Sequence, residues 1–454
     1  MGGSTSIMNK SSRAWLALSV LFAINLLNFF DRQLLGALGE PVRKEFHLSD
    51  SALGFLGTIF TIMYAFVGLP FGRLSDRWSR TRLIALGTGV WSLLTAASGV
   101  AQNFTQMVIC RLGVGVGEAT CAPAGQSLIG DSFPPHQRAR AMGIFMLGLP
   151  LGLFLAYMSV AFIAPKHGWR SVFLFALAPG LVLAIAALFL KEPVRGALDP
   201  ARRTIPEGVG SVAGSPWAIL ALPTMWWIIL SGVLHNFNMY AIGAFQTPFL
   251  QRFHEMSLRN ASLVSSVSAG LVGAVGLLIG GYLADKLSAK RRNGRLLLSG
   301  WAMLIAAPCI FLAVNQPRGS ISAFVALMSG GTMTMYVYYA TVYAAIQDVI
   351  EPRLRGMAVA IYFCAMYLLG ASMGPYATGL LSDHFAHAAM VQAGASGMTE
   401  AFKAVGLHNA MYIIPILALL ASAVLFAASR TVERDIRKQE EAHAAIAPAA
   451  LPQT

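Results

Sequence analysis

Long hydrophobic runs separated by short polar breaks dominate the chain. Each run has about 20 residues, the length that an α-helix needs to cross the hydrocarbon core of a bilayer. The runs lack the ten-residue in-and-out alternation of outer-membrane β-strands. We therefore predict an all-α membrane protein with twelve transmembrane helices, at 14–36, 53–72, 83–101, 105–130, 138–164, 171–190, 224–250, 262–284, 296–314, 321–346, 355–382 and 407–428.

The longest polar break, rich in Pro, Gly and charge, separates six spans from six. A repeated motif supports two pseudo-symmetric halves, because Gly72-Arg-Leu-Ser-Asp-Arg after the second span matches Gly281-Tyr-Leu-Ala-Asp-Lys after the eighth. Parallel repeats of this kind build transporters whose substrate site lies between the halves. The predicted divisions are an N-terminal six-helix bundle, a cytoplasmic linker, a C-terminal six-helix bundle and a cytoplasmic tail, at 1–190, 191–223, 224–430 and 431–454.

Composition and charge place the chain in a membrane. Hydrophobic residues make up 56% and charged residues 12%, whereas soluble domains carry about 25% charged residues. The formal net charge is +13, and 23 of the 33 Lys and Arg lie in the N-terminus, every second loop and the C-terminal tail. This asymmetry predicts cytoplasmic termini in a plasma (inner) membrane. The basicity follows from topology, so no nucleic-acid partner is expected.

The cysteines do not indicate a metal site or disulfides, and the N-terminus does not indicate a signal peptide. Cys110, Cys121, Cys309 and Cys364 all fall within spans and have no metal-ligand spacing, so we expect no disulfide framework, metal or cofactor. The first hydrophobic run continues into a charged segment without a small-residue cleavage site, which favours a retained helix over a signal peptide.

Apart from arginines at the span ends, four charged residues lie inside predicted spans, and all belong to the first half: Asp31, Arg32, Arg111 and Glu118. A charge at the bilayer centre costs at least ~2.5–3.5 kcal/mol, so such residues face a partner or a water-filled path. Glu118 follows Arg111 by two helical turns, roughly 10 Å deeper on the same face. We predict that these four residues form the proton-coupling and substrate site.

We hypothesise that Arg111 pairs with Asp31 and exchanges toward Glu118 or toward an anionic substrate group as one carboxylate binds a proton. The alternative is a static ion pair that holds the first span against the fourth. Arg32 points about 100° away from Asp31 on the same helix, so it need not share that partner and can face the outer cavity instead.

The second half supplies polar and aromatic side chains in place of charge. Candidate cavity-lining residues are His235, Asn236, Tyr336 and Tyr367. Charge on one wall and an apolar or aromatic surface on the other suit an amphiphile with a polar head and an apolar tail. The alternative for each tyrosine is helix packing, and His235 is either a second protonatable group or a packing residue.

The repeated motif is a candidate cytoplasmic gate. It combines a glycine suited to close packing, an acid near a helix end and several arginines, and the candidates are Gly72, Asp76, Arg77, Arg80 and Asp285. Asp76 can pair with an arginine or with a helix N-terminus in one conformation and release it in another. The alternative is that these residues lie at the interface only to obey the topology rule.

This motif after spans two and eight, with twelve spans, resembles the signature of the major facilitator superfamily. Arg111-Leu-Gly-Val-Gly-Val-Gly resembles its fourth-helix motif, and Gly148-Leu-Pro-Leu-Gly loosely resembles its Gly/Pro motif of the fifth helix. Gly370-Ala-Ser-Met-Gly-Pro holds the corresponding position in the second half. The resemblance implies the major facilitator fold.

Three further motifs together resemble the Spinster family: Asn28-Phe-Phe-Asp-Arg, Gly115-Val-Gly-Glu-Ala, and Asp131-Ser-Phe-Pro followed by Arg138-Ala-Arg-Ala-Met-Gly. Animal members of that family transport sphingosine-1-phosphate or lysophospholipids, with proton coupling in some of them. The resemblance implies a bacterial homologue of these lipid transporters.

The expected function is secondary active transport by alternating access within the lipid bilayer, coupled to protons. The expected substrate is a small amphiphilic or lipid molecule, namely a lysolipid-like or other amphiphilic anion. The alternative within transport is an organic-acid or multidrug/proton carrier of the same superfamily. A membrane enzyme would need a nucleophile or metal constellation, which the sequence does not offer, so the protein is not expected to be an enzyme. A receptor or scaffold without transport is a third option, and monomeric function is usual in this superfamily.

Overall fold

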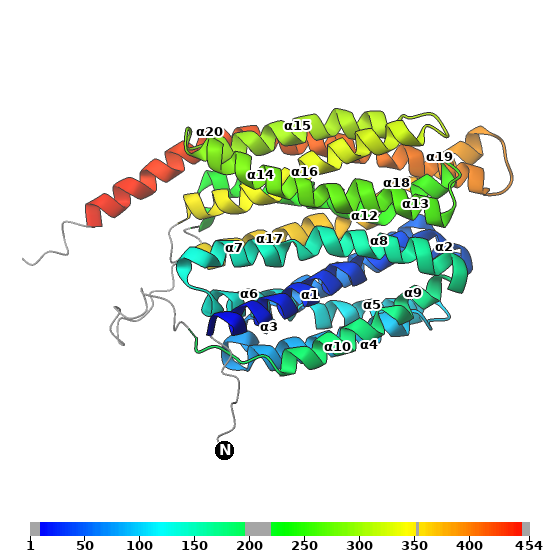
Figure 1. Ribbon diagram of the computed structural model, residues 1–454. Coiled ribbons are helices and arrows are strands. Elements are labelled where there is room, and N and C mark those ends of the chain that lie inside the picture. Colours follow the sequence, from blue (N-terminus) through cyan, green and yellow to red (C-terminus); the bar gives the residue numbers. More distant parts are fainter. Residues whose placement is uncertain (1–9, 196–218, 351–353, 447–454) are drawn as a thin grey trace, which may run out of the picture. The chain divides into compact units, whose positions relative to one another are not determined.

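The computed structural model describes residues 10–195, 219–350 and 354–446. Every regular element in these ranges is helical (Figure 1). The helices are α1 (Lys10–Ala37), α2 (Gly39–Glu45), α3 (Asp50–Arg77), α4 (Arg80–Ser98), α5 (Phe104–Glu118), α6 (Cys121–Ser132), α7 (Pro135–Met146), α8 (Gly148–His167), α9 (Trp169–Phe175), α10 (Leu177–Leu188), α12 (Pro223–Arg252), α13 (Leu258–Ser265), the π-helix η2 (Ser266–Leu271), α14 (Val272–Ser288), α15 (Gly294–Val314), α16 (Ile321–Val349), α17 (Arg355–Ala365), the π-helix η4 (Met366–Ala371), α18 (Met373–Gln392), α19 (Glu400–Met411) and α20 (Ile413–Ile446).

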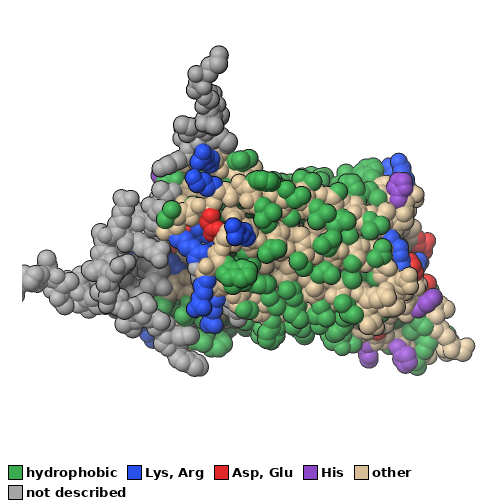
Figure 2. Space-filling model, turned by 90° about the horizontal axis from the view of Figure 1, so that it is seen from below, with side chains coloured by type: hydrophobic (Ala, Val, Ile, Leu, Met, Phe, Trp, Pro, Cys, Tyr) green, Lys and Arg blue, Asp and Glu red, His purple; other side chains and the backbone are tan. Residues whose placement is uncertain are grey.

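Eleven helical segments in the described ranges are long and apolar enough to cross a membrane. The remaining predicted span, 83–101, corresponds to α4, whose Arg80, Arg82 and polar residues lower its mean hydropathy. Several spans consist of two successive helices, such as α5 with α6 and α7 with α8. Figure 2 shows one face of the protein on which hydrophobic side chains cover the middle and Lys and Arg gather toward one end. This distribution fits a surface that contacts lipid.

By contacts between residues, the chain divides into two units. Unit 1 contains 1–46 and 59–211, and unit 2 contains 47–58 and 212–454. The break at 211/212 falls in the predicted linker, of which 196–218 lie outside the described residues. Helix α3 thus contributes its first turns to unit 2 and the rest to unit 1.

Four helix pairs recur at equivalent positions in the two units. In unit 1, α1 contacts α8 and α10, and α4 contacts α5 and α10. In unit 2, α12 contacts α18 and α20, and α15 contacts α16 and α20. Counted as spans, the first packs on the fifth and sixth and the third on the fourth and sixth in each unit. The two units are therefore related by the pseudo-symmetry that the repeated motif predicts.

Glycines at matching positions allow the first and fifth spans to approach closely. A Cβ on Gly152 would lie 2.4 Å from the carbonyl oxygen of Leu26, and one on Gly374 would lie 2.4 Å from the carbonyl oxygen of Phe237. Small residues at such positions let the backbones of membrane helices meet. The two Gly/Pro motifs of the sequence therefore make equivalent contacts in the two units.

A buried ionic cluster fastens the start of α3 inside unit 2. The guanidinium of Arg252 donates two hydrogen bonds of 2.8 Å to the carboxylate of Asp50. Ser382 donates to the same carboxylate at 2.6 Å, and the backbone N–H groups of Asp50 and Ser51 donate to Asp383. Asp383 therefore caps the N-terminus of α3, where a carboxylate is electrostatically favoured.

Candidate functional site

Two helices of unit 1 carry the four ionisable residues predicted for the site. Asp31 and Arg32 lie on α1, and Arg111 and Glu118 lie on α5, which Asn103 caps by accepting a hydrogen bond from the backbone N–H of Gln106. Asp31, Arg111 and Glu118 are fully buried, and the side chain of Arg32 is 8% exposed. The structure thus brings all four together in the interior of unit 1.

Arg32 is the ion-pair partner of Glu118. Its Nε donates a hydrogen bond of 2.7 Å to Oε2 of Glu118. Three aromatic rings surround its guanidinium, at 4.2 Å from the ring centre of Tyr64, 5.0 Å from Phe29 and 5.4 Å from Phe60. Cation–π contact of this kind stabilises a charge that has left water. Arg32, which the sequence left free either to join the candidate site or to face an outer cavity, therefore lies in the candidate site beside Glu118.

Asp31 and Arg111 do not form the expected ion pair. Both carboxylate oxygens of Asp31, and Nε and Nη2 of Arg111, have no hydrogen-bond partner among the described residues. Arg111 and Glu118 nevertheless lie close enough to Asp31 to act on its charge. The ion pair that the structure shows instead joins Arg32 to Glu118.

Two side chains that sequence reasoning missed lie beside Asp31. These are Trp91 and Thr95 of α4, both fully buried. Asn28, one turn before Asp31, lies beside Glu118. The sequence does contain a signal for α4, since polar residues recur at helical spacing in an otherwise apolar span.

The charges of the four residues sum to zero when both acids are ionised. Such a set can bind one proton on a carboxylate or one anion on a guanidinium, and each event changes the electrostatic balance for the other. In the described ranges no three His, Cys, Asp or Glu side chains gather as a metal site would require. The candidate site is therefore suited to reversible binding of a proton and of an anion.

In unit 2, His235 and Asn236 lie in an aromatic cluster. The fully buried ring of His235 stacks on Tyr338 at 4.0 Å between centres and meets the edge of Tyr339 at 4.8 Å. Asn236 accepts a hydrogen bond of 3.2 Å from the hydroxyl of Tyr339. Neither ring nitrogen of His235 has a hydrogen-bond partner in the described part of the chain.

The two tyrosines predicted to line a cavity differ in exposure. Tyr336 is buried and packs against Gly273 and Gly276 of α14, which fits helix packing. Tyr367 is half-buried and meets Tyr240 and Phe363. Tyr367 therefore belongs to an accessible aromatic surface, and Tyr336 does not.

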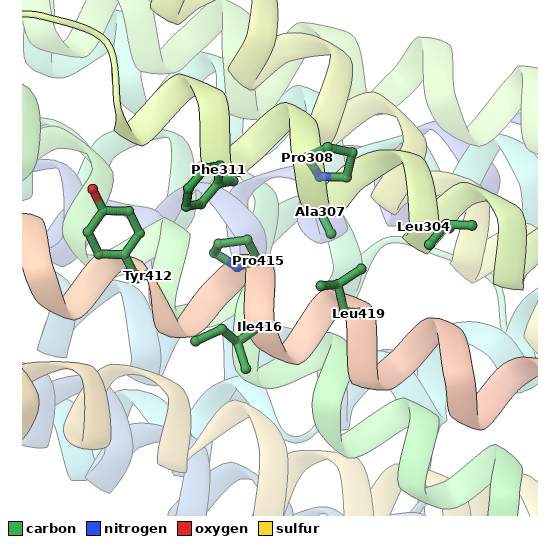
Figure 3. Close-up of a pocket in the computed structure, with 8 residues that line it drawn as sticks. All are labelled: Leu304, Ala307, Pro308, Phe311, Tyr412, Pro415, Ile416 and Leu419. Carbon is green, nitrogen blue, oxygen red and sulfur yellow. The ribbon is translucent and has the colours of Figure 1, made fainter.

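Unit 2 also contains an apolar groove of about 860 Å³ between α15 and the start of α20. Figure 3 shows the side chains that line it: Leu304, Ala307, Pro308, Phe311, Tyr412, Pro415, Ile416 and Leu419. None of these lining residues carries a charge. The groove is therefore distinct from the ionisable site of unit 1.

The cytoplasmic motif of unit 1 is built around Arg80. Its buried guanidinium binds Asp131 at the end of α6 and Glu192 after α10, with 3.0 Å between Nε and Oε1 of Glu192. Partial burial works to raise the pKa of Glu192, but hydrogen bonds from Ser79 and from the backbone and side chain of Arg80 outweigh it, so the pKa lies below its ordinary value. Arg80 thus fixes three segments of unit 1 to one another.

The other gate candidates are less enclosed. Beyond the backbone of its own helix, no described atom lies within 4 Å of a Cβ placed on Gly72, so close packing against another element does not explain this glycine here. Arg77 is exposed, and the side chain of Asp76 lies outside the described part of the chain. Asp285 is exposed and lies 3.8 Å from Arg295.

Comparison with known proteins identifies relatives that belong to one superfamily of transporters. A family model of the Major Facilitator Superfamily matches residues 21–375. An MFS-type efflux pump of Mycolicibacterium smegmatis is 30% identical over 428 residues, which cover 93% of this chain and 94% of the pump. Protein spinster homolog 1 of Homo sapiens is 29% identical over 403 residues, which cover 82% of this chain and 73% of that protein.

Among solved structures, a bacterial homologue of the human lysosomal transporter Spinster, in an inward-facing and unoccupied conformation, is similar over nearly the whole chain. The TM-score is 0.83 at 28% sequence identity, and the match covers 95% of this chain and 99% of that one.

Proposed function

This chain belongs to the Major Facilitator Superfamily and is homologous to the Spinster proteins, and we propose that it is a proton-coupled transporter of a lysolipid-like or other amphiphilic anion. The superfamily assignment makes it a multi-span integral membrane transporter and not an enzyme. The identity of the substrate and the coupling to protons are the parts that we propose from the site.

The observation that carries the proposal is the unpaired edge of Arg111. Its Nε and Nη2 are buried without a hydrogen-bond partner among the described residues. These two donors form the planar fork that binds a carboxylate or phosphate through two hydrogen bonds. A buried guanidinium with this edge unpaired is suited to an anionic group of a substrate.

The count of charges supports the proposed proton coupling. With Asp31 and Glu118 ionised, Arg32 and Arg111 are both balanced, and an added anion would give a net negative charge in a buried place. Once one carboxyl is protonated, the set carries one positive charge that a monoanion neutralises. Proton binding therefore favours anion binding.

Unit 2 by itself has an aromatic surface that suits an apolar group. Half-buried rings gather there on α12, α16, α17 and η4: Tyr240, Tyr339, Tyr343, Phe363 and Tyr367. His235 and Asn236 lie behind these rings and orient Tyr339. Aromatic side chains commonly line pockets that bind apolar groups such as hydrocarbon tails.

We further propose that the protein works as a monomer in the plasma (inner) membrane with both termini in the cytoplasm. Alternating access would involve the cytoplasmic motif, in which Asp76 and Arg77 engage and release partners while Arg80 remains fixed within unit 1. Asp285 would act at the equivalent position of unit 2.

A flux assay in proteoliposomes tests the proposal. Purified protein is offered a panel of lysolipids and organic anions with and without an imposed pH gradient. We expect uptake of an amphiphilic anion that increases with the gradient and falls when the tail is shortened. Uptake that ignores the pH gradient would refute proton coupling.

The second candidate is an organic-acid or multidrug/proton carrier. It is favoured by the likeness to the MFS-type efflux pump of Mycolicibacterium smegmatis over nearly both whole chains. The same panel separates the two candidates, because transport of short anions or of unrelated drugs without dependence on a tail would support the carrier.

A further inference from the structure

One face of α4 consists of buried polar side chains that the exchange described above does not use. They are Thr88, Trp91, Ser92 and Thr95, and all four are fully buried. In a helix with 3.6 residues per turn, these positions fall within an arc of about 100°. The four side chains therefore share one face of α4, on which Ser92 packs against Gly180 of α10.

These side chains have no partner in their own helix. Thr88 Oγ1, Trp91 Nε1, Ser92 Oγ and Thr95 Oγ1 have no partner of normal hydrogen-bond geometry among the described residues, although Trp91 and Thr95 approach the carboxylate of Asp31. Ser98, one turn further on, behaves in the usual way for a helical serine, since its hydroxyl donates to the carbonyl oxygen of Leu94 at 3.0 Å. Buried polar groups are nearly always paired with protein or with ordered water.

Polar atoms of α1 and α5 are unpaired in the same region. Trp91 and Thr95 lie beside Asp31, and Arg111 lies near it. Both carboxylate oxygens of Asp31, Nδ2 of Asn28 and two nitrogens of Arg111 lack a partner among the described residues. Trp91 and Thr95 of α4 and Arg111 of α5 thus surround Asp31 of α1, and Asn28 of α1 lies beside Glu118 of α5.

The charges around Asp31 indicate which ligand fits there. Arg111 and Glu118 act on it from α5, and Arg32 follows it on α1. The stretch 83–98 of α4 and the whole of α10, which packs on α4 and α1, contain no ionisable residue. Two guanidinium groups disfavour a metal cation, whereas water can accept from Trp91 and donate to the hydroxyls and carboxylates.

We propose that this place, bounded by Asn28 and Asp31 of α1, the Thr88–Thr95 face of α4 and Arg111 of α5, binds ordered water that carries the proton between Asp31 and Glu118. The proton-transfer part rests on the proposed function. The proton leaves the carboxyl oxygen of Asp31 for a water molecule, and a proton of that water passes to Oε1 of Glu118, which is also unpaired in the described structure. A buried water typically makes about three hydrogen bonds, and the unpaired atoms suffice for that number.

Radiolytic hydroxyl-radical labelling of the purified protein tests for the water, because bound water is itself the source of the radicals. We expect Trp91 to be labelled although it is fully buried, and the Thr88→Val/Thr95→Val variant to reduce this labelling roughly tenfold, as the loss of hydrogen bonds to the water predicts. Ser98→Ala is the matched control on the same helix and should label as the wild type does. Trp91 labelled no faster than the buried Phe245 would overturn the proposal.

Substrate-driven proton uptake in proteoliposomes tests the path. Thr95→Val should slow proton uptake roughly tenfold, and Thr95→Ser should restore it because serine keeps the hydroxyl. A Thr88→Val/Thr95→Val protein that takes up protons at the wild-type rate would show that these hydroxyls do not hold the path. If the wild type moves no protons, the proposed function fails, whereas the labelling of Trp91 still decides the water site.

Discussion

Nε of Arg32 lies 2.7 Å from Oε2 of Glu118, which makes the residue next to Asp31 the partner of the more distant acid. The two carboxylates of the site are therefore unequal. Glu118 forms an ion pair with the guanidinium of Arg32, whereas the carboxylate of Asp31 has no partner of normal hydrogen-bond geometry in the described ranges. Because a buried charge without a partner is costly, Asp31 is the acid that we expect to bind the transported proton.

Replacing Asp31 by Asn should separate substrate movement from the pH gradient. The amide keeps the shape of the protonated acid but cannot release a proton, so we expect exchange of labelled substrate to continue and gradient-driven accumulation to cease. Uptake into proteoliposomes with and without an inward proton gradient measures both. Accumulation at the wild-type level would show that the proton binds elsewhere.

Replacing Arg111 by Lys should weaken binding of the anion. Lysine keeps the positive charge but loses the planar pair of donors, and we expect affinity to fall by about tenfold or more. Equilibrium binding of the best substrate in the flux panel measures this change. The exposed Arg13 provides the control, since Arg13→Lys should bind as the wild type does, and equal affinity of both variants would contradict the role of Arg111.

Replacing Arg252 by Gln should destabilise the protein through unit 2. The substitution leaves the buried carboxylate of Asp50 without its two charged hydrogen bonds, and removal of one partner of a buried pair costs about 3–5 kcal/mol. Thermal unfolding in detergent should show a lower melting temperature. The double variant Asp50→Asn/Arg252→Gln should recover part of the loss, and a single variant as stable as the wild type would contradict this account.

Replacing Glu192 by Gln should destabilise the protein in a pH-dependent way. Burial raises the pKa of Glu192, but the hydrogen bonds that it accepts from Ser79 and Arg80 lower the pKa by more. The net pKa is therefore below the ordinary value. The folded state therefore holds the charged form more firmly than the unfolded state does. This stabilisation is present above the unfolded pKa of about 4.3 and is lost as the pH falls through the folded pKa.

We accordingly expect Glu192→Gln to lower the melting temperature at pH 7 and to approach the wild type at pH 4 and below. Thermal unfolding across this pH range measures the effect. Glu433→Gln, at an exposed position, is the control and should show no such trend. A difference from the wild type that stays constant with pH would assign the effect to packing and not to charge.

Local properties of the chain were enough to predict its spans and to identify the charged residues of the site. Hydropathy depends on neighbouring residues alone, and the cost of a charge in lipid applies wherever that charge lies along the chain. For this reason the twelve spans, the internal repeat and the set Asp31, Arg32, Arg111 and Glu118 could be read without coordinates. The family resemblance rested on the same local motifs.

The tertiary structure decided which charges meet. A long arginine side chain can reach a partner from more than one helical face, so the spacing of Asp31 and Arg111 did not reveal that Arg32 binds Glu118. The burial of Arg80 between Asp131 and Glu192 and the polar face of α4 beside Asp31 likewise depend on how each helix is rotated in its bundle. The rotation of each helix about its axis is fixed by packing against residues far away in sequence, such as the contact of Gly152 with Leu26. Hydropathy along the chain does not determine this rotation.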